Sequence, residues 1–184
     1  MEKRMISVKT VVAIGIGSAL MFVLMRFMMI PTGIPNTTIN LGIAILALFA
    51  AIFGPIAGFL IGFIGHTLVD LTAGWGIWWS WILASALLGL AIGCFWKFFQ
   101  IEDGEFGMKQ AVVFNGIQVI GNIIAYVFIA PALDLLIYQE PFEKVTLQGF
   151  TAAAANAVGV LVLGTILAFA YSKTRAKSGS LKEE

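Results

Sequence analysis

Cysteine, histidine and charged residues are all scarce in this chain of 184 residues. Its one cysteine, Cys94, excludes an internal disulfide and a cysteine metal cluster. With one histidine and no H-E-x-x-H motif, no zinc site is expected. The chain also lacks the Walker A pattern of ATPases and the G-x-S-x-G elbow of serine hydrolases. We therefore expect no ATP hydrolysis by this chain, no metal and no cofactor.

The shortage of charge points to a membrane. Only 11% of the residues are charged and 60% are hydrophobic, whereas a soluble domain has about 25% charged and roughly 45–50% apolar residues. A chain this small cannot bury so much apolar surface in water, so the lipid bilayer must act as its solvent. The net charge is only +1 and no basic stripe is present, so nucleic acid is not an expected partner.

Six apolar stretches predict an all-α membrane protein. A spanning helix needs about 20 apolar residues, and the expected spans are residues 7–30, 38–53, 55–71, 77–99, 110–130 and 145–171. Pro55 separates the second span from the third, and Pro131 is expected to end the fifth, because proline breaks a helix. The first span lacks a cleavage site, so we expect it to be retained. The prediction is a single bundle of six transmembrane helices over residues 1–184, with a solvated tail at 173–184.

Lysine and arginine set the expected orientation. They gather before the first span, around the loop at 100–109 and after the sixth span. The positive-inside rule places these three regions, and so both termini, in the cytoplasm. The segments 30–40, 72–80 and 131–144 are then expected to meet at the outer face.

Polar residues follow one face of the fifth span. Asn115, Gln118, Asn122 and Tyr126 lie at i, i+3, i+7 and i+11, which is one stripe on a helix. Such a stripe either forms hydrogen bonds between helices or lines a cavity. We expect Asn122 and Tyr126, in the outer half, to line a site. Asn115 is equally well explained as structural.

The third span carries a second one-face series. Gly58, Gly62, His66 and Asp70 follow one another at i+4. His66 and Asp70 form either a satisfied structural pair, which is the commoner case, or a proton relay. Arg26 and Asp70 both lie near outer span ends, where they either pair or meet a ligand.

Four tryptophans cluster where the fourth span begins. Trp75, Trp78, Trp79 and Trp81 fall within seven positions. An aromatic belt at the lipid headgroups is the usual explanation. The four cannot all face lipid at one depth, so we expect at least one indole to point inward and stack on a planar ligand.

Small residues in the first span form two pairs on opposite faces. Ala13 and Gly17 are four apart, as are Gly15 and Ala19. Small-xxx-small pairs let helices approach closely. One pair is therefore expected to pack inside the bundle and the other to dock a membrane partner, although purely internal packing explains the spacing equally well.

Several of these features together resemble a known family. The outer segment IPTGIPNTTIN, the run LALFAAIFGPIAGFLIGFIGHTLVDL, the WWSW cluster and the closing AYSKTRAKSGSLKEE look like an S-component of an energy-coupling factor (ECF) vitamin transporter. The resemblance covers nearly the whole chain, and is greatest to a subgroup associated with riboflavin or hydroxymethylpyrimidine transport. It implies a substrate-capture subunit of the bacterial plasma membrane. The implied partners are a transmembrane coupling subunit and two ABC-type ATPase subunits.

The resemblance also suggests roles for individual residues. The segment at 30–40 is expected to be a lid over one vitamin-like molecule. Because the candidate binding amides carry no charge, a neutral heteroaromatic ligand, such as a hydroxymethylpyrimidine or pyridoxine-like vitamin, is expected. The first-span docking signature Ala-x-x-x-Ala appears only in altered form, as Ala13/Gly17 or Gly15/Ala19. The candidate substrate-binding residues are Asn36, Asn40, Trp78, Trp79, Asn122, Tyr126, Gln148 and Asn156.

Two other functions remain open from the sequence. A stand-alone secondary carrier would usually show an internal repeat and a buried coupling site, and neither is visible. A membrane-embedded enzyme would use His66 and Asp70, but no nucleophile or metal set accompanies them.

Overall fold

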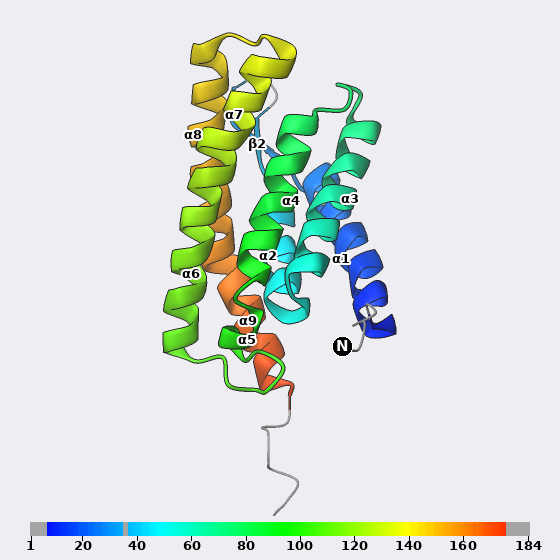
Figure 1. Ribbon diagram of the computed structural model, residues 1–184, viewed down its shortest axis with the longest axis vertical. Helices are drawn as coiled ribbons and strands as arrows, with labels where there is room; N and C mark the ends of the chain where they lie inside the picture. The colour runs from blue at the N-terminus through cyan, green and yellow to red at the C-terminus, as the bar shows by residue number, and fades with distance from the viewer. Residues whose placement is uncertain (1–6, 35–36, 176–184) are drawn as a thin grey trace, which may run out of the picture.

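The computed structural model describes residues 7–34 and 37–175, which form an elongated helical bundle with connecting loops at its two ends (Figure 1). Its elements in chain order are α1 (Val8–Phe27), β1 (Ile30–Pro31), β2 (Thr38–Ile39), α2 (Gly42–Phe53), α3 (Pro55–Ala73), α4 (Trp79–Gly93), α5 (Trp96–Phe99), α6 (Met108–Asn122), η1 (Ile123–Ile129), α7 (Ala130–Leu133), η2 (Asp134–Tyr138), α8 (Phe142–Gly159), η3 (Val160–Gly164) and α9 (Thr165–Lys173). The elements marked η are π-helical turns.

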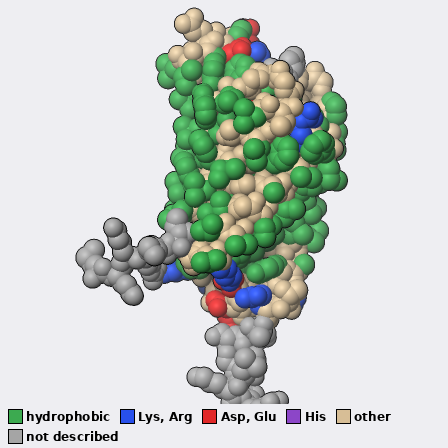
Figure 2. Space-filling view, turned by 90° about the vertical axis from the view of Figure 1, so that its right-hand side faces the viewer, with side chains coloured by type: hydrophobic (Ala, Val, Ile, Leu, Met, Phe, Trp, Pro, Cys, Tyr) green, Lys and Arg blue, Asp and Glu red, His purple; other side chains and the backbone are tan. Residues whose placement is uncertain are grey.

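Four helical stretches are long and apolar enough to cross a membrane. They are Val8–Phe27, Pro55–Ala73, Met108–Tyr138 and Phe142–Lys173. The helices α2 and α4 are shorter apolar helices of 12 and 15 residues. Hydrophobic side chains cover most of the face in Figure 2, while charged side chains gather toward its two ends. This distribution suits a bundle surrounded by lipid.

The fifth span does not end at Pro131, contrary to the prediction. The helix runs on through α7 and η2 to Tyr138, and only Gln139–Pro141 remain outside helices before α8. A π-helical segment ends at Ile129, two residues before the proline, and the Ala130 N–H bonds to the carbonyl of Ala125, five residues back. The wider turn accommodates a ring that lacks an N–H and would crowd an ordinary α-turn.

Two other spans begin or end differently from the prediction. The second helix begins at Gly42 and not near Thr38, because Thr38 and Ile39 pair with Pro31 and Ile30 in a short antiparallel hairpin. The fourth helix begins at Trp79 and stops at Gly93, and α5 follows as a separate short helix. The described chain is therefore helical apart from this hairpin and the loops.

Glycines bring α3 and α4 into close contact. A Cβ added at Gly58 would clash with the carbonyl of Gly89, and one added at Gly62 would lie 2.6 Å from the carbonyl oxygen of Ser85. Close backbone approach of this kind depends on small residues. The face of α3 that carries Gly58, Gly62, His66 and Asp70 therefore points toward α4. Its two polar residues, His66 and Asp70, lie beside the first turns of α4.

The start of α1 and the end of α9 lie at the same end of the bundle (Figure 1). There, Lys9 Nζ lies 2.5 Å from Glu102 Oε1, and Arg175 Nη2 lies 3.9 Å from the same oxygen. The opposite end carries the hairpin and the loops around Trp75 and Glu140. This is the end predicted to face outward, and it is called the outer end from here on.

Candidate binding site at the outer end

Two adjoining compartments open at the outer end. The first, called the acidic compartment, has about 480 Å³ of non-atom space, part of it open to solvent, and is lined by His66, Asp70, Trp75, Trp78, Trp81, Asp134, Lys144 and Gln148. The second, called the amide compartment, holds about 570 Å³ and is lined by Met25, Thr37, Thr38, Asn40, Ile43, His66, Val69, Trp75, Trp81, Tyr126, Ala152 and Asn156. His66, Trp75 and Trp81 belong to both, so they form the wall between them.

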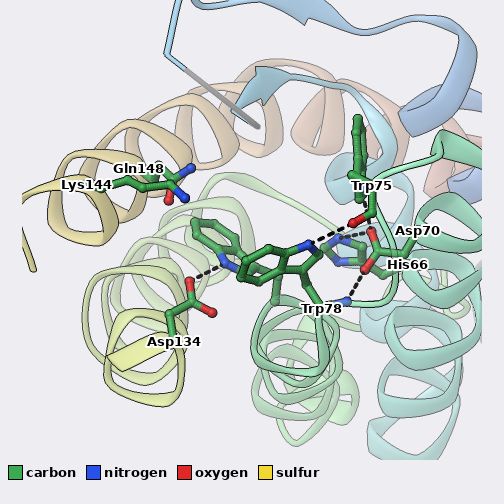
Figure 3. Close-up of a pocket in the computed structure, with 8 residues that line it drawn as sticks. His66, Asp70, Trp75, Trp78, Asp134, Lys144 and Gln148 are labelled. Carbon is green, nitrogen blue, oxygen red and sulfur yellow. Dashed lines mark hydrogen bonds and ion pairs between the residues drawn. The ribbon is translucent and has the colours of Figure 1, made fainter. Parts of the chain in front are cut away.

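Asp70 fixes the loop that connects α3 to α4. The indole Nε1 of Trp75 donates to Asp70 Oδ1 at 3.1 Å, and the backbone N–H of Trp78 donates to Asp70 Oδ2 at 2.9 Å. Gly74 and Gly76 have φ values of 87° and 88°, which glycine adopts without strain. The loop therefore folds back onto Asp70 and places Trp75 and Trp78 over the acidic compartment (Figure 3).

Asp134 holds the opposite wall of this compartment. It is 1% exposed and accepts hydrogen bonds from the hydroxyl of Ser80 and from Trp81 Nε1, the latter at 2.7 Å. In Figure 3, Asp134, Lys144 and Gln148 lie on one side, His66, Asp70 and Trp75 on the other, and Trp78 between them. Two helical layers thus face each other across the compartment.

A chain of short polar contacts crosses the bundle beneath the dividing wall. Tyr126 OH lies 2.7 Å from Ser85 Oγ, which lies 2.6 Å from His66 Nδ1. His66 Nε2 is 3.8 Å from Asp70 Oδ1. His66 is therefore a satisfied structural residue that connects the interior of the bundle with Asp70. The expected alternative of an Arg26–Asp70 pair is not seen among the described residues. Instead, Arg26 Nη2 donates to the Thr72 carbonyl at 3.3 Å.

Five of the eight residues proposed from sequence line the compartments. Asn40, Tyr126 and Asn156 line the amide compartment, and Trp78 and Gln148 line the acidic compartment. Asn36 lies outside the described residues.

Trp79 and Asn122 are not among the lining residues. The Trp79 side chain is 49% exposed, and its ring stacks on Phe63 with centroids 6.1 Å apart. This suits the aromatic belt better than an inward orientation. Asn122 is fully buried, and its Nδ2 donates to the carbonyl and the Oε1 of Gln118.

The inner part of the amide stripe forms hydrogen bonds between helices. Asn115 Nδ2 donates to Thr165 Oγ1 at 2.9 Å, and Gln118 Nε2 donates to the carbonyl of Ala157 at 3.1 Å. These bonds tie α6 to α8 and α9. The structural alternative considered for Asn115 accounts for its contacts, and only Tyr126 of the stripe reaches a compartment.

Sequence reasoning did not name Asp134 and Lys144 as site residues. Both were assigned to the outer loop at 131–144, because Pro131 was expected to end the fifth span and the sixth span was expected to begin at residue 145. The structure begins α8 at Phe142. Since the helix of the fifth span continues past Pro131, Asp134 lies eight residues beyond Tyr126 in the same helical run and is directed inward. At about 100° per residue, an ideal α-helix would place Asp134 off the polar stripe. The π-helical turns on either side of Pro131 change that phase, so the periodicity of the sequence did not mark this residue.

The two faces of α1 differ as the paired small residues suggested. Ala13 and Gly17 are buried, and a Cβ added at Gly17 would lie 2.7 Å from Ile61 Cδ1. Gly15 and Ala19 are exposed, and a Cβ added at Gly15 would meet no described atom within 4 Å. One face therefore packs inside, and the other is free for lipid or a partner.

The chain is closely similar to several bacterial proteins. The UPF0397 protein of Clostridium perfringens (strain SM101 / Type A) is 52% identical over 184 residues, which covers both chains completely. The UPF0397 protein of Lacticaseibacillus casei (strain BL23) is 50% identical over 183 residues, with 100% of this chain and 98% of the relative covered. That of Enterococcus faecalis (strain ATCC 700802 / V583) is 49% identical over 182 residues, with 99% and 100% covered. No solved structure matches the chain significantly.

The profile of one protein family spans almost the whole bundle. It is described as "ECF-type riboflavin transporter, S component" and matches residues 5–173. The matched region includes every described helix and both compartments. The resemblance seen in the sequence is confirmed: this chain belongs to the family of S components of ECF-type riboflavin transporters.

Proposed function

We propose that this chain captures a small vitamin or vitamin precursor in the two outer compartments and delivers it by docking on a coupling subunit energised by two ATPases. The observation that carries the proposal is the family match over residues 5–173, together with a polar and tryptophan-lined site at one end of the bundle. As an S component, the chain is a multi-pass membrane protein that serves transport and is not an enzyme. The enzymatic alternative for His66 and Asp70 is thereby set aside.

The proposal places six helical segments across the membrane with both termini in the cytoplasm. Lysines at the inner end support this orientation through the positive-inside rule: Lys9, Lys97, Lys109 and Lys173 all lie on elements at that end (Figure 1). The two short helices α2 and α4 cross only with help from the loops and hairpin that extend them. We therefore treat the whole described chain as one six-helix transmembrane domain.

The hairpin is the proposed lid over the amide compartment. Thr32 Oγ1 donates to the Thr37 carbonyl at 2.6 Å and accepts from the Ile34 N–H at 3.2 Å, which braces the turn. Thr37, Thr38 and Asn40 from this segment line the compartment. A substrate bound there would therefore contact the lid directly, and ordering of the lid would accompany binding.

The exposed face of α1 is the proposed docking surface. Gly15 and Ala19 leave a shallow strip on which a partner helix can pack closely. Ala13 and Gly17 are already used for packing against α2 and α3. The surface lies away from both compartments, so docking and substrate binding use different parts of the molecule.

Complex recovery and transport test this function together. A tagged chain is expressed with a candidate coupling subunit and ATPases, and the purified material is reconstituted in liposomes. We expect all four polypeptides to co-purify and substrate uptake to require ATP. Concentrative uptake by the chain alone would instead identify a stand-alone secondary carrier and refute the proposal.

A further inference from the structure

The acidic compartment has the features of a site for a positively charged group. We propose that it receives the cationic end of the substrate, so that the substrate class is an organic cation and not a neutral ring. This inference rests on the proposed function only in treating the compartment as part of the substrate site. It replaces the neutral ligand expected from the amide residues alone.

Asp70 brings a buried negative charge to the compartment. It is 3% exposed, and both of its oxygens accept hydrogen bonds from groups that can only donate, the Trp75 indole and the Trp78 backbone N–H. That arrangement is typical of an ionised carboxylate. These two donors are neutral dipoles, so they satisfy its hydrogen bonds without cancelling its charge. His66 Nε2 lies 3.8 Å from Asp70 Oδ1, which is beyond hydrogen-bonding distance.

Asp134 adds a second acidic group from the opposite wall. Its two oxygens accept from Ser80 and Trp81, which are also uncharged. Lys144 is the lysine that lines the compartment, and its Nζ lies 2.6 Å from Glu140 Oε2. Since Lys144 is already paired with another carboxylate, the lining keeps a negative balance that a ligand cation would offset.

Three indole rings line the same compartment as these acidic residues. Trp75, Trp78 and Trp81 all line the compartment, and tryptophan has the aromatic face that attracts cations most strongly. Lys144 Nζ lies 5.9 Å from the centroid of the Trp78 ring. An ammonium group of the chain itself thus already occupies a position against one of these rings.

Lys144 can leave this position when a ligand enters. Its side chain is 33% exposed and is carried by a flexible stem at the start of α8. A ligand cation would take over the aromatic face, while Lys144 stays paired with Glu140. An anionic ligand would instead meet Asp70 and Asp134 at close range, which is unfavourable in a low-dielectric site.

The adjoining compartment indicates where the rest of the ligand lies. Asn40 is 9% exposed, and its Oδ1 is buried without a hydrogen-bond partner among the described residues. A buried acceptor without a donor is costly, so a donor on the ligand would relieve it. The two compartments share His66, Trp75 and Trp81, so one molecule with a cationic end and a hydrogen-bonding end can reach both.

Three probes of one ring size test the charge preference. N-methylpyridinium, pyridine and nicotinate are titrated separately onto the purified chain in a neutral detergent, at a pH where pyridine is uncharged. Binding is measured by saturation-transfer NMR, with protein-free micelles as the blank. We expect N-methylpyridinium to bind at least about tenfold more tightly than pyridine and nicotinate to bind most weakly. Equal binding, a preference for nicotinate, or no detectable binding of N-methylpyridinium would overturn the inference.

Matched substitutions locate the effect. Asp70→Asn and Asp134→Asn should each weaken N-methylpyridinium binding by about tenfold, and should weaken it more than they weaken pyridine binding. Glu143→Gln removes one charge from an exposed position on the same outer end and should change neither value. Because the aspartates also hold local structure, Lys144→Gln provides the second arm. It should strengthen N-methylpyridinium binding, and a decrease or no change would overturn the inference.

The outcome is separable from that of the proposed function. The probe measurements use the chain alone and need neither coupling subunit nor ATP. If the complex assembles and transports but the probes show no preference for the cation, the substrate class is wrong and the function stands. If the cation binds preferentially but no complex forms, the substrate class stands and the proposed function is wrong.

Discussion

The hydroxyl of Tyr126 lies 2.7 Å from the hydroxyl of Ser85, and both side chains are buried. This contact joins the π-helical segment η1 to α4 at the floor of the amide compartment. Ser85 also reaches His66, so the pair links three helical segments. Tyr126 therefore has a structural role in addition to its proposed role in binding.

Removing this hydroxyl should affect both stability and binding. We expect Tyr126→Phe to lower the free energy of unfolding by about 0.5–1.5 kcal/mol, because Ser85 loses one partner in a dry site. Substrate affinity should fall as well, since the compartment loses a polar group. Thermal unfolding in detergent and calorimetry with the substrate measure the two effects.

Tyr171→Phe is the matched control for this change. Tyr171 is partly buried against the core in α9, at the other end of the bundle. The same substitution there should leave substrate affinity unchanged. If Tyr126→Phe also leaves both quantities unchanged, the Tyr126 hydroxyl has neither role.

Replacing Asp70 should loosen the loop between α3 and α4. An asparagine keeps only one acceptor oxygen, so Asp70→Asn leaves either the Trp75 indole or the Trp78 N–H without its partner. We expect the Trp78 amide to exchange its hydrogen about 10- to 100-fold faster, as the loss of a hydrogen bond to a charged group implies. Hydrogen-exchange mass spectrometry of the segment 74–78 measures this directly.

Glu143→Gln serves as the comparison for loop exchange too, since it neutralises an exposed acid on the same end. It should leave exchange in segment 74–78 unchanged. Slow exchange retained in Asp70→Asn would mean that the glycine turns and the packing of Trp75 hold the loop without the carboxylate.

Close glycine packing between α3 and α4 predicts a steep cost for added volume. Gly58→Ala places a methyl group against the Gly89 backbone, which cannot rotate away. We expect a loss of about 1–3 kcal/mol in unfolding free energy, typical of overpacking. Gly116→Ala is the control, because a Cβ there meets no described atom within 4 Å. Denaturant titrations in detergent that gave equal stabilities for the two variants would contradict this interpretation.

Most of the bundle followed from apolar run lengths and the turn residues between them. Pro55 does open a new helix, as predicted, because its preceding residue is Gly54 with a φ of 87° that no continuing helix adopts. Pro131 does not end its helix, because the wider π-helical turn before it accommodates the ring. Pro131 follows Ala130 and not a glycine, and this is the local difference between the two prolines. The continuation of this helix moved Asp134 from a loop into the site, and Lys144 left the same loop because α8 begins at Phe142.

The site was only partly predictable for a related reason. Periodicity places a residue on a helix face, but the neighbouring helix decides whether that face meets a cavity or another side chain. Asn122 and Tyr126 share a stripe, yet Asn122 Nδ2 donates to Gln118 on its own helix while Tyr126 reaches the compartment. Tryptophan clusters carry the same ambiguity, since Trp78 lines a compartment and Trp79 stacks on Phe63 at the lipid surface.

The two small-residue faces of α1 permit a test that separates folding from docking. Gly17→Leu forces a bulky side chain against Ile61 and Phe49, whose atoms lie 2.7 and 2.9 Å from the position of a Cβ. We expect this variant to be destabilised by about 1–3 kcal/mol or more, since the side chain has no room.

Gly15→Leu adds the same side chain on the exposed face, where it meets no described atom nearby, so stability and substrate affinity should stay at the wild-type level. If the exposed face docks the coupling subunit, the added volume holds the partner helix away, and co-purification and ATP-driven uptake should both be lost. The measurement pairs substrate binding with complex recovery for each variant. A Gly15→Leu chain that assembles and transports normally would show that the coupling subunit docks on another surface.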